Sequence, residues 1–186
     1  MLIVGLGNPG TEYADTFHNM GYLVMDVLSS KLNKKINKIE CSSLTCVFSV
    51  KGEKVILAKP TTYMNLSGQA VKSLLNKYEQ SLDDLIVIYD DIDIPRFSVR
   101  ARENGGAGTH NGMRNVVETV ASENFKRIRM GIGMEDMDLR DYVLNKINAE
   151  DKKVFNEVAE KLADLIIAYL SDRDYAKLMR EANVIK

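Results

Sequence analysis

Short apolar runs alternate with longer segments of helical periodicity along the chain. Residues 2–6 and 85–89 are apolar throughout, as expected of strands covered on both faces, whereas residues 20–32 repeat apolar side chains at helical spacing. The same patterns predict strands at 54–58, 98–102 and 127–132, and helices at 66–78, 112–120, 151–170 and 174–182. This alternation predicts an α/β fold, a three-layer sandwich with a mixed, largely parallel central sheet flanked by helices.

Length and composition narrow the class of protein. The 186 residues suit one domain, and we expect it to span residues 1–186. Apolar residues make up 45% and charged residues 27%, so a disordered, collagen-like or coiled-coil chain is excluded. Cys41 and Cys46, with two histidines in the chain, are too few for a zinc site or a disulfide scaffold. Since no segment approaches 18 apolar residues, we expect a soluble cytoplasmic protein with no membrane partner.

The charges nearly cancel in total but are unevenly distributed. There are 25 basic and 26 acidic residues, and a net charge of -1 argues at first against a polyanionic partner. However, residues 81–95 hold acidic groups only, while 96–133 are mainly basic and rich in arginine, whose planar guanidinium suits phosphate. Taken alone, a basic segment of this kind is typical of a solvated, ion-paired surface. Together with the loops described next, it favours a surface that binds nucleic acid.

The first loop, G-L-G-N-P-G at residues 5–10, matches the G-x-G-x-x-G pattern of dinucleotide-binding turns. That turn needs a helix opening on the third glycine, whereas residues 11–18 lack helical periodicity. We therefore expect no nicotinamide or flavin cofactor. A glycine loop after a strand is still where α/β sheets bind ligands.

The two histidines are the candidate bases. His18 and His110 are each followed by an asparagine and lie beside glycine-containing loops. Imidazole titrates near neutral pH, and neighbouring amides can hold a substrate carbonyl or a water. No G-x-S-x-G segment is present, which argues against a serine nucleophile on a strand-to-helix elbow.

Three carboxylates follow the strand at 85–89. Asp90, Asp91 and Asp93 could hold Mg²⁺ for phosphoryl chemistry, or one of them could orient a histidine ring. In an extended chain Asp91 and Asp93 share a face and Asp90 points opposite. Because the other polar candidates are amides and imidazoles, we favour ring orientation and keep a metal-dependent phosphoesterase as the alternative.

Two further loops precede predicted helices. Asn65 opens the helix at 66–78, where it could be a substrate contact or simply an N-cap. Residues 104–112 are rich in glycine, and the N–H groups at the start of the next helix could receive a phosphate or a carboxylate.

Six segments in one order resemble the bacterial peptidyl-tRNA hydrolases. They read G-L-G-N-P-G, F-H-N, K-P-T-T-Y-M-N-L-S-G, Y-D-D-I-D, G-G-A-G-T-H-N-G and F-K-R-I-R-M-G-I-G. The resemblance covers nearly the whole chain and is weakest at 34–51 and after 136. It implies a monomeric enzyme that needs no metal or other cofactor. Such an enzyme cleaves the ester between peptide and tRNA in peptidyl-tRNA and so recycles tRNA from abandoned translation.

The resemblance also implies roles for individual residues. His18 corresponds to the general base that activates water, Asp90 to the carboxylate that orients it, and Asn8 to the asparagine that recognises a peptide amide. Asn111 corresponds to the asparagine that polarises the attacked carbonyl or positions the water. The other positions implied in substrate or tRNA contact are Tyr13, Tyr63, Met64, Asn65, Gly108, His110, Arg100, Arg102 and Arg129.

The chain departs from the family pattern at three positions. Tyr89 and Ala107 stand where many members have histidine, and Met134 stands where a basic residue is common. Glu135 and Asp136 add negative charge next to Met134. None of these departures changes a catalytic position. A non-catalytic RNA-binding module that uses the basic segment is the third hypothesis, and turnover of peptidyl-tRNA distinguishes it from the first.

Overall fold

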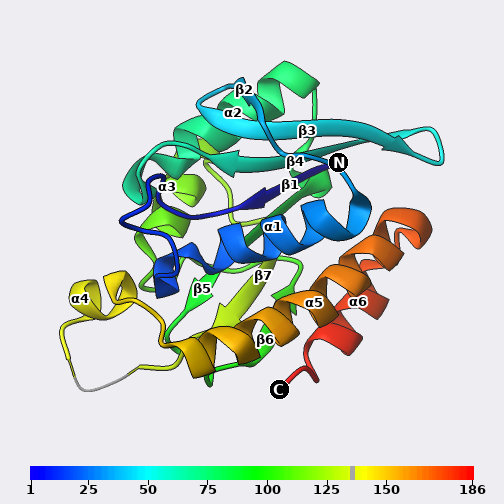
Figure 1. The fold of residues 1–186 in the computed structure, drawn as a ribbon. Helices are drawn as coiled ribbons and strands as arrows, with labels where there is room; N and C mark the ends of the chain where they lie inside the picture. Colours follow the sequence, from blue (N-terminus) through cyan, green and yellow to red (C-terminus); the bar gives the residue numbers. More distant parts are fainter. Residues whose placement is uncertain (135–136) are drawn as a thin grey trace.

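The computed structural model describes residues 1–134 and 137–186, which form one mixed sheet of seven strands with helices on both faces (Figure 1). The strand order is β2-β3-β4-β1-β5-β7-β6. Its centre is parallel and consists of β4 (Glu53–Pro60), β1 (Leu2–Gly5), β5 (Leu85–Asp91) and β7 (Lys126–Gly131). The edges are antiparallel and consist of β2 (Lys38–Glu40) and β3 (Ser43–Val50) on one side and β6 (Val99–Arg102) on the other.

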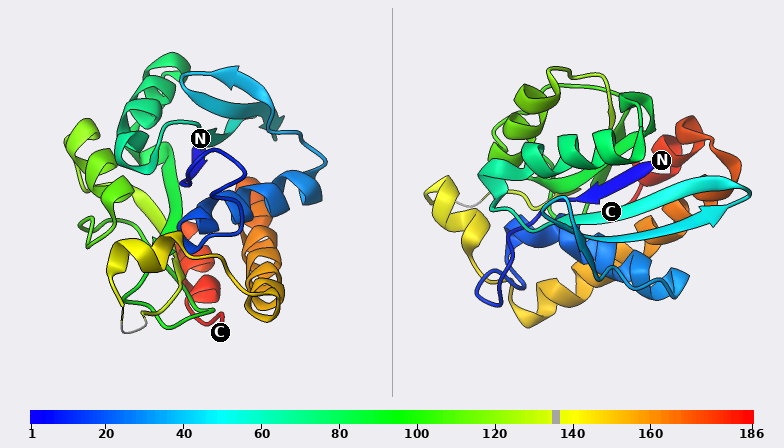
Figure 2. Two further views of the ribbon diagram at one scale, coloured as in Figure 1. Left: turned by 60° about the vertical axis from the view of Figure 1, so that its left-hand side comes forward. Right: turned by 90° about the horizontal axis from the view of Figure 1, so that it is seen from above.

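Helices cover the sheet in two layers, which confirms the predicted sandwich (Figure 2). One layer consists of α2 (Ser67–Tyr78) and α3 (Asn111–Val120), and the other of α1 (Met20–Leu32), α5 (Ala149–Asp172) and α6 (Tyr175–Ala182). Each layer buries its own apolar cluster against the sheet, and a fully buried aliphatic side chain contributes roughly 1.5–3 kcal/mol. The short elements are η1 (Phe17–Asn19), η2 (Met64–Leu66), η3 (Leu82–Asp84) and α4 (Leu139–Leu144). In the described part of the chain, no helix is long and apolar enough to cross a membrane.

Helix α1 lies unusually close to the sheet because of two glycines. A Cβ atom on Gly21 would lie 2.4 Å from the carbonyl oxygen of Ile88 and from backbone atoms of Leu6, and one on Gly5 would lie 2.3 Å from the Gly21 carbonyl oxygen. Any larger residue would push the helix away from the sheet. Since η1 leads directly into α1, this contact also sets the position of His18 relative to the end of β5.

The apolar periodicity locates all of the elements it predicts, with bounds shifted by a few residues. It does not predict β2, β3 or α4. Strand β2 is three residues long and its Ile39 is exposed. Strand β3 alternates between buried and half-buried positions in its first half and between exposed and half-buried positions in its second half, so it lacks a continuous apolar run. Helix α4 has six residues, fewer than two turns, which is too short for a periodic signal.

Candidate active site

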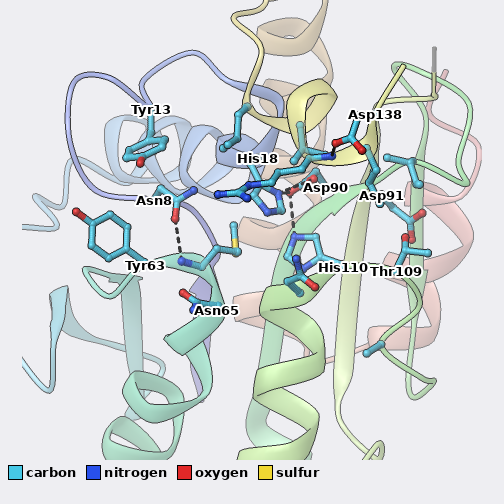
Figure 3. A pocket seen from close by; sticks show the side chains of 18 residues that line it. Asn8, Tyr13, His18, Tyr63, Asn65, Asp90, Asp91, Thr109, His110 and Asp138 are labelled. Carbon is cyan, nitrogen blue, oxygen red and sulfur yellow. Dashed lines mark hydrogen bonds and ion pairs between the residues drawn. The ribbon is translucent and has the colours of Figure 1, made fainter. Parts of the chain in front are cut away.

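A cavity of about 630 Å³ lies at the carboxyl ends of the parallel strands (Figure 3). Its lining comes from the loop after β1, from η1 and η2, from the end of β5, from the loop before α3 and from α4. This edge of an α/β sheet is where ligands bind, because the loops there diverge and leave a crevice.

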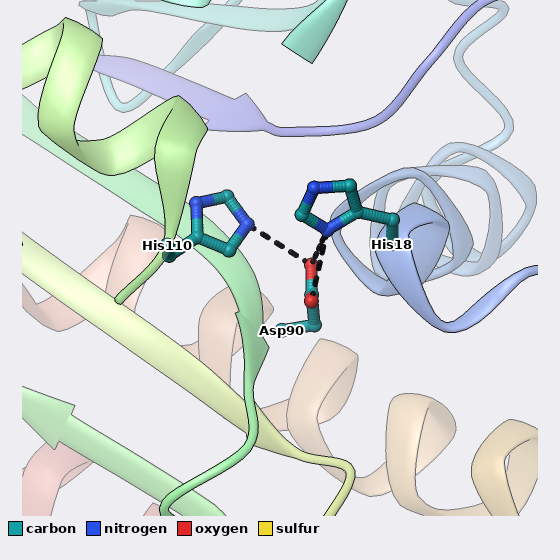
Figure 4. Close-up of side chains that lie close together, drawn as sticks. All are labelled: His18, Asp90 and His110. Atoms are coloured by element: carbon teal, nitrogen blue, oxygen red, sulfur yellow. Dashed lines mark hydrogen bonds and ion pairs between the residues drawn. The ribbon is translucent and has the colours of Figure 1, made fainter. Parts of the chain in front are cut away.

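The cavity floor holds a hydrogen-bonded pair between His18 and Asp90 (Figure 4). His18 Nδ1 lies 3.1 and 3.0 Å from the two carboxylate oxygens of Asp90, which is 1% exposed. Because a carboxylate can only accept hydrogen bonds, His18 Nδ1 must carry the proton. The neutral ring then has its lone pair on Nε2. No described residue bonds Nε2, which leaves this atom available to a water in the cavity.

A second imidazole donates to the same carboxylate. His110 Nδ1 accepts the N–H of Met113 at 3.0 Å and thereby caps α3, so its proton must be on Nε2. That nitrogen lies 3.1 Å from Asp90 Oδ1. The centroids of the two histidine rings are 4.8 Å apart, and the centroid of the Tyr89 ring is 5.0 Å from that of His110. Both polar atoms of His110 are therefore used inside the protein.

Burial and charge have opposite effects on the pKa values of His18 and Asp90. Burial alone would lower the pKa of His18, but the charge of Asp90 and the hydrogen bond to it outweigh burial and raise that pKa above its ordinary value of 6.5. Burial alone would raise the pKa of the Asp90 carboxyl, but His18 and His110 together hold it well below its usual range. At neutral pH, Asp90 is a carboxylate poised to stabilise a protonated His18.

Hydrogen bonds hold both the backbone of Asn8 and its side-chain oxygen. Its N–H donates to Asn19 Oδ1 at 2.8 Å, Asn19 Nδ2 donates to the Asn8 carbonyl at 3.1 Å, and Asn8 Oδ1 accepts the N–H of Met64 at 2.8 Å. The Nδ2 group of Asn8 lines the cavity without a partner among the described residues. This group can donate to a substrate carbonyl. The supporting role of Asn19 is visible only in the structure.

Aromatic and amide side chains form the remaining walls expected from the sequence. Tyr13 and Tyr63 pack edge to face with ring centroids 6.3 Å apart. Asn65 lines the cavity from within η2 and caps no helix, so the N-cap interpretation is wrong. Met64 is buried in the wall, and Asn111 lines the cavity at the first position of α3.

Four of the expected contact residues do not line the cavity. Gly108 lies in the loop before α3 with a positive φ of 58°. Arg100 and Arg129 are paired across β6 and β7, and Arg102 lies two residues further along the same face of β6. This face is opposite the one that Val99 and Ala101 bury against α5 and α6. Arg102 is exposed, whereas Arg129 Nη1 lies 3.1 Å from Asp91 Oδ2.

A neighbouring arginine has an internal role that the basic segment does not reveal. Arg127 is 1% exposed and donates to the carbonyls of Gly106 and Glu123, each at 2.9 Å. It therefore anchors the glycine-rich loop that leads to His110. Within the basic segment, Arg102 is exposed, whereas Arg127 is buried. Arg100 is half-buried, and its Nη1 donates to the carbonyls of Val99 and Asn183 at 2.7 and 3.0 Å.

The three departures from the family pattern occupy different settings. Burial raises the pKa of Tyr89 to about 12, so its phenol stays neutral beside His110. Ala107 lines the cavity, and Met134 is 55% exposed. Glu135 and Asp136 lie outside the described residues.

The carboxylate trio of the metal hypothesis does not assemble. Asp91 pairs with Arg129 and accepts the N–H of Asp93, while Asp93 itself is exposed. Among the described residues, His18, Asp90 and His110 have ligand atoms within 4.8 Å of one another, a nitrogen and oxygen set that zinc accepts. In the structure both nitrogens facing Asp90 carry protons for its carboxylate, so a metal would have to displace them.

Several lining residues were not predicted, chiefly those on and beside α4: Asp138, Leu139, Arg140, Val143 and Leu144. Asp138 caps α4 by accepting the N–H groups of Arg140 and Asp141. Asp138 at the N-cap position is the sequence signal that could have located this short helix.

Comparison with known proteins gives one family. A family model described as peptidyl-tRNA hydrolase matches residues 2–186. A peptidyl-tRNA hydrolase of Caldanaerobacter subterraneus is 46% identical over 167 residues, 89% of this chain and 90% of that protein. One of Finegoldia magna is 43% identical over 177 residues, 94% of each chain. A crystal structure of peptidyl-tRNA hydrolase from Acinetobacter baumannii superposes with a TM-score of 0.92 at 30% identity, covering 100% of this chain and 95% of the other. The chain therefore belongs to the peptidyl-tRNA hydrolase family.

Proposed function

We propose that this protein hydrolyses the ester between the peptide and the 3′-terminal ribose of peptidyl-tRNA and so recycles tRNA from abandoned translation. It acts as a monomer in the cytoplasm and without a metal. The observation that carries this proposal is the buried His18–Asp90 pair, in which His18 Nδ1 bonds the carboxylate and His18 Nε2 is left free toward the cavity.

The reaction takes two steps. His18 Nε2 removes a proton from water while the oxygen of that water attacks the ester carbonyl, and Asp90 stabilises the imidazolium that forms. The tetrahedral intermediate then expels the ribose 3′-oxygen, which takes the proton back from His18. The products are a peptide with a free carboxyl group and a tRNA with a free 3′-hydroxyl.

Amides position the substrate. The free Nδ2 group of Asn8 donates to a carbonyl of the peptide, which a free aminoacyl group lacks at that place. Asn111 polarises the attacked carbonyl, where negative charge develops in the transition state. Asn65, Tyr13, Tyr63 and Met64 bind the remainder of the peptide end.

The tRNA binds outside the cavity, along the sheet face that bears Arg100, Arg102 and Arg129. Arg102 is exposed and therefore available to phosphate. Ala107, Thr109 and His110 of the loop before α3 line the cavity, and Gly108 of the same loop borders the acceptor end of the tRNA.

Replacing His18 by alanine tests the chemistry. Without the base we expect release of N-acetylated peptide from tRNA to fall about 10²-fold or more, with the thermal unfolding midpoint measured to confirm folding. Chelation of divalent metals should leave the wild-type rate unchanged. Full activity in His18→Ala contradicts the mechanism, and loss on chelation with recovery in Mg²⁺ supports a metal-dependent hydrolase instead.

The pH profile tests the role of Asp90. Water activation needs neutral His18, so kcat/KM should fall as the pH drops through the raised pKa of His18. Replacing Asp90 by asparagine removes the charge that raises this pKa. The acid limb should then move to lower pH, while the maximal rate drops about 10²-fold or more. A limb that stays in place would mean that Asp90 does not control the titration of His18.

Salt dependence tests the tRNA face. We expect Arg102→Glu to weaken tRNA binding and to flatten the slope of log affinity against log salt by about 1. The control is Arg180→Glu on α6, which covers the opposite face of β6. Hydrolysis of a minimal substrate with only the terminal nucleotides should change little in Arg102→Glu. Equal losses on full-length and minimal substrates would remove Arg102 from the tRNA face.

A further inference from the structure

One cation in the cavity wall has no side-chain partner among the described residues. The charged residues that line the cavity, histidines aside, are Asp90, Asp91, Asp138 and Arg140. Each carboxylate already has partners: Asp90 accepts hydrogen bonds from the two imidazoles, Asp91 pairs with Arg129, and Asp138 caps α4. The N–H of Arg140 donates to Asp138 at 2.9 Å, but no group in the described residues accepts from its guanidinium. A positive charge is therefore available to a ligand.

Its surroundings belong to the peptide end of the proposed site. Leu139, Val143 and Leu144 of α4 line the cavity beside Arg140. Helix α4 packs against η1, which bears His18, and the chain after α4 is fixed to the loop that bears Tyr13, with the N–H of Ile147 2.8 Å from the Asp15 carbonyl. The arginines assigned to tRNA lie outside the cavity on β6 and β7. Arg140 thus faces a space lined by apolar, aromatic and amide side chains and by the histidines and carboxylates whose hydrogen bonds are described above.

We propose that Arg140 forms a subsite for a carboxylate side chain of the peptide, so that the enzyme favours peptidyl-tRNAs with an acidic residue near the ester. This inference rests on the proposed function. The planar guanidinium can hold a carboxylate through two parallel hydrogen bonds, and the apolar neighbours lower the local screening by water. Because Arg140 is itself exposed, the preference is modest.

The test compares three substrates with the same tRNA and the same C-terminal alanine. Acetyl-Glu-Ala-tRNA, acetyl-Gln-Ala-tRNA and acetyl-Lys-Ala-tRNA carry a negative, a neutral and a positive penultimate side chain, and the Glu and Gln side chains have the same shape. For the wild type we expect kcat/KM for the Glu substrate to exceed that for the Gln substrate by about 3- to 10-fold, with the Lys substrate slowest.

Three variants make the comparison specific. In Arg140→Gln the Glu-to-Gln ratio should fall to about 1, and in Arg140→Glu the Lys substrate should become the preferred one. The control, Arg180→Gln, removes the same charge from an exposed position outside the cavity and should keep the wild-type ratio.

The outcomes separate this inference from the proposed function. A wild type that hydrolyses all three substrates equally overturns the carboxylate subsite and leaves the hydrolase intact. An equal loss on all three substrates in Arg140→Gln also overturns it and assigns Arg140 to a phosphate of the tRNA. A wild type that hydrolyses none of them overturns both proposals.

Discussion

The buried carboxylate of Asp90 is the interaction on which the site depends. A charge at 1% exposure has lost its water and is stable only where donors replace that water. Here two imidazole N–H groups do so, one from η1 and one from the residue that caps α3. These donors come from positions 18 and 110, so the carboxylate is satisfied only when the fold brings both segments to the end of β5.

Two features provide that arrangement: a close backbone contact on one side and a buried arginine on the other. Gly21 and Gly5 let α1 lie directly on β1 and β5, which sets the approach of His18. On the other side, the buried guanidinium of Arg127 holds the carbonyls of Gly106 and Glu123 and so orders the loop that delivers His110. His110 in turn couples the start of α3 to the carboxylate. A net charge of -1 conceals this organisation, because acidic groups gather at the strand end and arginines on the adjacent edge.

The elements predicted from the sequence are those with a strong apolar signal. Strands β1 and β5 are buried on both faces, and α1 buries one clear face, so their composition reveals them. The edge strands β2 and β3 and the short helix α4 bury too little to leave such a pattern. Because the sequence pattern did not predict α4, the cavity wall that bears Arg140 was not predicted either.

For the site, the sequence motifs pointed to His18, Asp90, Asn8, Asn65 and Asn111, and the fold brings these residues to one cavity. Asp90 and Asp91 both line it, but Asp90 bonds the two histidines and Asp91 bonds Arg129. What the sequence could not show are contacts between distant segments: the clamp of Asn19 on Asn8 and the inward turn of Arg127. Such contacts depend on tertiary geometry and not on local pattern.

The tautomer and pKa of His18 test the central claim most directly. Nitrogen-15 NMR of the imidazole rings, followed over pH, reports which nitrogen carries the proton. We expect that above its pKa His18 is protonated on Nδ1 and free on Nε2, with a pKa above 6.5. A neutral His18 protonated on Nε2, or a pKa below 6.5, would contradict it.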